Sequence, residues 1–73
     1  MSAKGRYDLE RLSGKPTPLK LMARGQGVDV YLGAGWAKGV VQESTTERCV
    51  VWMTQGQRCI TVYDKRNIRR HSQ

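Results

Sequence analysis

Ten of the 13 Lys and Arg residues lie in the two ends of the chain, where they could neutralise phosphates. Residues 1–26 carry a net charge of +4 and residues 65–73 another +4, whereas residues 27–64 carry −1. Each cation that pairs with a phosphate releases a condensed counterion, so such ends favour nucleic acid in a salt-sensitive manner. Basic ends also keep small proteins in solution, and this alternative stays open. The C-terminal cations expected to contact phosphates are Lys65, Arg66, Arg69 and Arg70.

Aromatic side chains beside cations could stack on the bases of a single strand. If a two-residue hairpin loop forms at Gln55–Gly56, then Arg48, Trp52 and Tyr63 lie on one face of the sheet. We therefore predict a nucleic-acid contact patch made of these three side chains, in addition to the C-terminal cations.

The aromatic rings also allow a second kind of recognition, in which several ring faces surround a methylated ammonium group. Each ring has a core or hairpin role open to it as well, so both interpretations stay open. Asp29 could supply an anion to such a cage. The rings available for the cage are Tyr31, Trp36, Trp52 and Tyr63.

The residues that commonly support catalysis or metal binding are sparse and poorly spaced. His71 is the only histidine and lies in the basic C-terminal end, away from any predicted nucleophile. Cys49 and Cys59 do not reproduce zinc-ligand spacing, and the expected hairpin register points them to opposite faces, so we expect both to be reduced. No glycine-rich phosphate motif occurs. The sequence therefore predicts no enzyme activity, no cofactor and no metal.

The elements that must position these side chains are short strands, because apolar residues alternate with polar ones from Gly27 onward. Val28, Val30 and Leu32 are expected to face inward together. Asp64–Asn67 is expected to form a tight turn, after which Ile68 anchors a last short strand. The other predicted strands span residues 36–42, 48–54 and 58–63.

The residues before Gly27 are expected to form a flexible basic arm. Residues 1–6 show no periodicity, and Pro16 and Pro18 remove backbone donors from the segment that follows. A short helix over residues 7–12 would form only if it docked, and residues 19–22 could pair as a strand. The predicted organisation is therefore an arm over residues 1–26, a barrel over residues 27–70 and a tail over residues 71–73.

Five short strands joined by tight turns bury a common face best by curling into a small barrel. The apolar spacing of these strands is carried by Val28, Val30, residues 36–41, residues 49–51, Gly56, Ile60, Val62 and Ile68. It resembles that of a Tudor-type or related SH3-like barrel. That resemblance implies an all-β, five-stranded SH3-like fold and a habit of binding methylated peptides or nucleic acid.

Two further stretches, residues 33–36 and residues 60–63, carry a weaker resemblance. They resemble the type II dihydrofolate reductases, SH3-like chains that assemble as homotetramers around a pore. The motif of that family is Val-Gln-Ile-Tyr, so Tyr63 matches, but Thr61 replaces the glutamine and removes an amide donor and acceptor.

Together these patterns predict a non-catalytic, nucleic-acid-binding small barrel, with a Tudor-like module that binds a protein or peptide as the alternative. DNA and RNA both stay open as the nucleic acid, and so does the oligomeric state. The longest apolar run has five residues, and the chain starts without a secretory signal, so we expect no membrane partner and a cytoplasmic protein.

Overall fold

The computed structural model describes residues 10–12 and 14–71, and these form an all-β fold. One 3-10 helix, η2, spans Lys65–Asn67. The strands are β1 (Glu10–Arg11), β2 (Gly27–Tyr31), β3 (Trp36–Ser44), β4 (Cys49–Met53), β5 (Arg58–Val62) and β6 (Ile68–Arg70).

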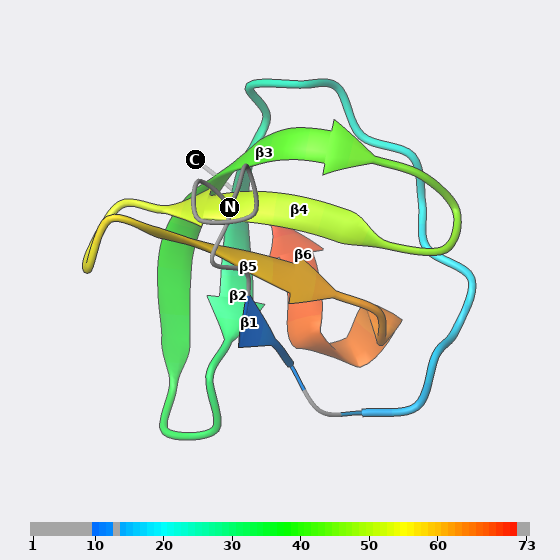
Figure 1. The fold of residues 1–73 in the computed structure, drawn as a ribbon, viewed down its shortest axis with the longest axis horizontal. Coiled ribbons are helices and arrows are strands. Elements are labelled where there is room, and N and C mark those ends of the chain that lie inside the picture. Colours follow the sequence, from blue (N-terminus) through cyan, green and yellow to red (C-terminus); the bar gives the residue numbers. More distant parts are fainter. Residues whose placement is uncertain (1–9, 13, 72–73) are drawn as a thin grey trace, which may run out of the picture.

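The strands form one sheet in the order β1-β5-β4-β3-β2-β6. Strands β2 to β5 follow one another as antiparallel neighbours, and β6 returns to pair antiparallel with β2. The two-residue β1 pairs parallel with β5 at the other edge. Figure 1 shows the sheet curled so that β2 and β6 lie behind β3, β4 and β5. The sheet is not closed, because β1 and β6 are its two edges.

The core follows from the alternation that predicted the strands. Inward-facing side chains of β2 to β5 are fully or almost fully buried, and Leu19 and Ile68 complete the same cluster. The bulky β-branched residues suit this pleated surface. The strand residues of the cluster are Val28, Val30, Val41, Cys49, Val51, Met53, Ile60 and Val62.

Residues 14–26, which the sequence assigns to the arm, run around the outside of the sheet between β1 and β2 (Figure 1). The backbone N–H of Leu19 donates to Thr46 O at 2.8 Å, and that of Thr17 donates to Tyr63 O at 3.0 Å. This segment therefore supplies a core residue and hydrogen bonds to the strands, although it contains no strand itself, including over residues 19–22.

The hairpin of β4 and β5 has the expected register, with Trp52 opposite Cys59 and Cys49 opposite Val62. The two thiols therefore point to opposite faces, and both cysteines are free. The expected inward position of Leu32 is wrong, because its N–H donates to Gly35 O and the chain has already left the sheet, so its side chain is 36% exposed.

The helix considered for residues 7–12 lies partly outside the described residues. Within them, Glu10–Arg11 is extended and pairs with β5. Residues 1–9, with Lys4 and Arg6 of the predicted arm, and residues 72–73 of the predicted tail also lie outside the described part. Among the described residues, no helix has the length and apolar character that spanning a membrane demands.

Candidate functional site

A groove of about 430 Å³ lies between the segment around Leu19 and the C-terminal elements η2 and β6. Its floor is apolar, because Leu19 and Ile68 are core residues and Pro18 and Met22 flank them. Cationic side chains from both sides surround this floor. They are Lys20, Lys65, Arg66, Arg69 and Arg70.

Two of the five cations in this basic groove are held by carboxylates. Arg66 pairs with Asp64 at 2.8 Å, and Arg69 pairs with Asp29 at 3.3 Å. Among the described side chains of residues 12 and 14–71, no carboxylate lies within ion-pair distance of positions 20, 65 and 70, all of which are exposed. The groove therefore keeps an excess of positive charge after its own ion pairs are counted.

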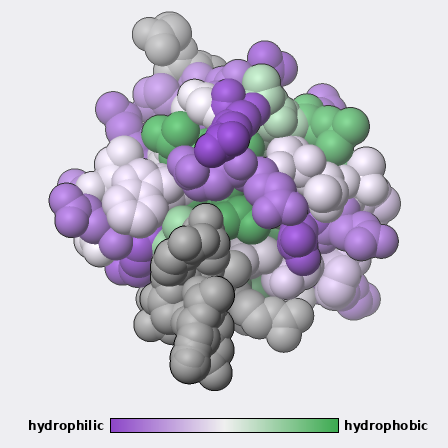
Figure 2. All heavy atoms as spheres, turned by 45° about the horizontal axis from the view of Figure 1, so that its top comes forward, coloured by the Kyte–Doolittle hydropathy of each residue, from purple (hydrophilic) through white to green (hydrophobic). Residues whose placement is uncertain are grey.

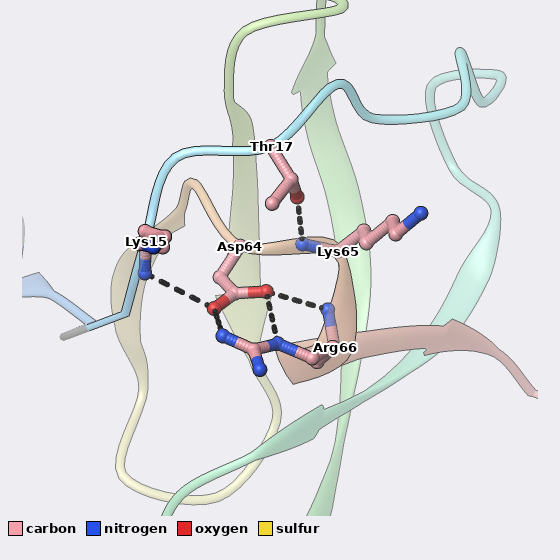
Figure 3. A network of polar contacts seen from close by, with 5 residues as sticks. All are labelled: Lys15, Thr17, Asp64, Lys65 and Arg66. Carbon is pink, nitrogen blue, oxygen red and sulfur yellow. Dashed lines mark hydrogen bonds and ion pairs between the residues drawn. The ribbon is translucent and has the colours of Figure 1, made fainter.

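The buried carboxylate of Asp64 joins the two sides of the groove through a hydrogen-bond network (Figure 3). Its Oδ2 accepts from the backbone N–H of Lys15 at 3.1 Å and from the Arg66 guanidinium at 2.8 Å. Its Oδ1 accepts from the backbone N–H of Arg66 at 2.9 Å and so caps η2. Beside it, Thr17 Oγ1 accepts from the backbone N–H of Lys65 at 2.7 Å. These bonds fix η2 against the segment that carries the opposite wall.

The hydrogen bonds that Arg66 donates to Asp64, from its side chain and then its backbone, lower the pKa of this carboxyl well below its usual range, although burial opposes them. The same contact raises the pKa of Arg66. Asp64 therefore stays ionised, and the corner of the groove keeps its charge pattern across the physiological pH range.

A second polar cluster surrounds Asp29 on the outer face of β2. Asp29 accepts from Arg69 Nε at 3.3 Å and lies 3.0 Å from His71 Nδ1. Burial raises the pKa of Asp29, but the hydrogen bonds from His71 and Arg69 together lower it below its usual value. The Arg69 guanidinium carbon lies 4.0 Å from the Trp36 ring centroid. Asp29 thus holds Arg69 over the Trp36 ring.

The predicted patch of Arg48, Trp52 and Tyr63 shares one face of the sheet, as the β4–β5 register implies, but it is not compact. Arg48 and Tyr63 line a smaller pocket of about 320 Å³ together with Arg24. Trp52 lies four residues from Arg48 along the chain, about 13 Å in an extended strand. Arg48 also pairs with Glu43 at 3.2 Å, which offsets its charge.

The four rings proposed for a cage divide between different places. Tyr31 and Trp36 are cross-strand partners with ring centroids 5.3 Å apart. Trp52 instead lies opposite Val40 and Cys59, and Tyr63 lines the pocket of Arg48. The cation next to the Trp36 ring is Arg69 of the chain itself.

Sequence reasoning did not single out Lys20 or Met22 as part of a site. Both lie in a segment without clear periodicity, and the groove residues that face them lie more than 40 positions away in the chain. One local feature could have indicated that this segment packs on the sheet, namely the apolar residues Leu19 and Leu21 on either side of Lys20. In the structure Leu19 is buried and Leu21 is 67% exposed.

A metal site or a reactive thiol would be another source of chemistry among the described residues. Among them, no group of three or more His, Cys, Asp or Glu side chains could hold a metal ion. Burial raises the pKa of the Cys49 thiol to about 11 and also raises the pKa of Cys59. Both thiols are therefore protonated and weakly nucleophilic near neutral pH.

Figure 2 shows purple hydrophilic side chains interleaved with small green hydrophobic areas on the face that it draws. Comparison of the chain with protein-family models, with curated proteins and with solved structures gives no match. The site is therefore interpreted from its own geometry and charge.

Proposed function

We propose that this protein is a non-catalytic nucleic-acid-binding module whose basic groove takes the phosphate backbone. The observation that carries this proposal is the gathering of five cations from two distant parts of the chain around one groove. Arg66, Arg69 and Arg70 come from η2 and β6, and Lys20 comes from the segment before β2. Flexible basic tails that act only on solubility need no such convergence.

The charge of the groove implies a definite dependence on salt. Three of its cations have no carboxylate partner among the described residues, so about three phosphates would be neutralised. For a single strand the logarithm of affinity then falls with the logarithm of salt concentration with a slope of about −2. Between about 50 and 200 mM salt the affinity should fall about 20-fold.

The fold that supports this function is proposed to be an SH3-like small barrel. The consecutive antiparallel strands, the strong curl of the sheet and the return of β6 to β2 support it. The core residue Ile68 lies between Arg66 and Arg69, so the C-terminal cations are anchored to the fold.

The experiment is a titration of fluorescently labelled oligonucleotides, single-stranded and duplex, followed by anisotropy across a salt series. The double variant K20Q/R70Q removes two groove charges and should reduce the slope to about −0.7. The double variant R24Q/R48Q removes the same formal charge from the other pocket and should leave the slope near that of the wild type. Absence of binding at low salt, or equal losses in the two variants, would overturn the proposal.

The Tudor-like alternative is less well supported, because Arg69 already lies over Trp36 and would repel a methylated ammonium at the same ring. The reductase alternative is also weaker, because Thr61, at the position of that family's glutamine, is only 2% exposed. Neither alternative accounts for the cations around the groove.

A further inference from the structure

Two aromatic rings are exposed side by side where β2 ends and β3 begins. Tyr31 and Trp36 are 39% and 40% exposed, and their ring planes are inclined at 56°. The Tyr31 hydroxyl donates to Gly33 O at 3.0 Å, which fixes its ring on the turn. Because the rings are held by cross-strand pairing and by this bond, they offer a preformed aromatic surface.

Arg69 lies over one face of the Trp36 ring and adds a planar cation to this surface. Its guanidinium carbon lies 4.0 Å from the Trp36 ring centroid, and its Nε is anchored to Asp29. β2 carries Asp29 opposite Arg69, so the sheet register determines the position of this side chain. More than half of the Arg69 side chain is nevertheless exposed. We call the three side chains Tyr31, Trp36 and Arg69 the stacking platform.

The stacking platform and the basic groove share Arg69, which also lines the groove with Arg70 and Lys65. A ligand that crosses Arg69 therefore meets the groove cations on one side and the aromatic pair of Tyr31 and Trp36 on the other. Nucleotides of a single strand have both complementary parts, a phosphate and an unpaired base with a π-face.

We propose that the ligand of the basic groove is single-stranded nucleic acid, with one unpaired base stacked on the platform of Tyr31, Trp36 and Arg69. This inference rests on the proposed nucleic-acid function and moves the stacking role from Trp52 to Trp36. A duplex meets only half of the site, because its bases are already stacked on one another.

Two single-tryptophan proteins test the proposal, because Trp36 and Trp52 are the only tryptophans and are similarly exposed. In W52F the emission comes from Trp36, and in W36F it comes from Trp52. We expect a single-stranded oligonucleotide to quench Trp36 strongly and to leave Trp52 nearly unchanged. Equal quenching of both, or quenching of Trp52 alone, would overturn the assignment of the platform.

Affinity measurements provide a second readout. W36L should lower single-strand affinity by about 5- to 150-fold, in line with the loss of one base stack, and should leave duplex affinity unchanged. W52L is the matched control and should change neither. R69K keeps the groove charge but loses the flat surface, so it should also lower the affinity for the single strand alone. Circular dichroism spectra like that of the wild type establish that each variant is folded.

The outcomes separate this inference from the function on which it rests. Binding of single strand and duplex with equal affinity, without a Trp36 response, would overturn the platform and leave the basic groove as a phosphate site. Binding of neither at low salt would overturn both. Preference for a single strand with loss in W36L and R69K but not in W52L is the result that we expect.

Discussion

Gly14 lies where the segment before the basic groove meets the buried carboxylate of Asp64, and its replacement by alanine should destabilise the fold. Its φ of 137° lies in a region that essentially only glycine adopts, which costs other residues about 1–3 kcal/mol. An added Cβ would also lie 2.7 Å from Asp64 Oδ2 and 3.1 Å from Asn67 Nδ2. Forced contacts of this kind cost about another 1–3 kcal/mol. We expect G14A to lose roughly 2–6 kcal/mol of unfolding free energy.

Gly33 provides the matched control, because its φ of 93° is also positive but a Cβ there would meet nothing within 4 Å. G33A should therefore lose only the backbone contribution, about 1–2 kcal/mol. For a chain of this size 1 kcal/mol corresponds to about 4–8 °C in Tm, so G14A should melt at least about 4 °C below G33A in thermal unfolding followed by circular dichroism. A G14A protein that melts at or above G33A would refute the packing of this corner.

Three further predictions concern the core, the carboxylates and the thiols. A Cβ at Gly39 would meet Val51 Cγ1 and lie 3.0 Å from Trp52 O. G39A should therefore lose about 1–3 kcal/mol of unfolding free energy, measured by urea unfolding. A loss below about 0.5 kcal/mol would contradict this packing. Asp64 and Asp29 have lowered pKa values when folded, so their stabilisation is present above the usual aspartate pKa of 3.8 and is lost as the pH falls below it. The double variant D29N/D64N should accordingly show a shallower fall of Tm with acid than the wild type, and an equal fall would count against the two ion networks. Cys59 is partly exposed and Cys49 is fully buried. In the native protein a thiol reagent should therefore modify Cys59 first, and Cys49 only after denaturant is added. Simultaneous modification of both thiols would contradict the burial of Cys49.

Local sequence patterns are sufficient to predict the positions of most of the strands. Alternation of apolar residues placed β2 and β3 within one or two residues of their observed ends, apart from Leu32. The turn around Gly56, whose φ is 86°, sets the β4–β5 register and therefore the faces of Cys49 and Cys59. These features depend on neighbours in the chain, which is why the sequence alone predicts them.

The packing of residues 14–26 depends on partners that lie far away in the sequence. Leu19 is buried in a cluster with residues of β2 to β6, and the backbone N–H of Lys15 is held by a carboxylate 49 residues further along the chain. Two prolines and little periodicity give no local sign of these contacts. The wall of the groove that carries Lys20 therefore had no counterpart in the sequence prediction.

The sequence predicts only part of the candidate site, because its remaining contacts also join residues that lie far apart in the chain. The C-terminal cations followed from composition, and the anchoring of that end by Ile68 followed from its position. The contact of Arg69 with Trp36 follows from the pairing of β6 with β2 and of β2 with β3, which joins residues 33 positions apart. Without that pairing, the sequence groups Trp36 with Tyr31, Trp52 and Tyr63 in one candidate cage. In the structure the ring of Trp36 lies beside Tyr31 and under Arg69.

The most direct test of the central claim is a titration of the isotope-labelled protein with a short single-stranded oligonucleotide at low salt, followed by amide chemical shifts. The basic groove and the stacking platform predict that the largest shifts occur in residues 19–22 and 65–70 and in the indole N–H of Trp36. Shifts concentrated instead around Arg24, Arg48 and Thr61, or no shifts at all, would contradict the account.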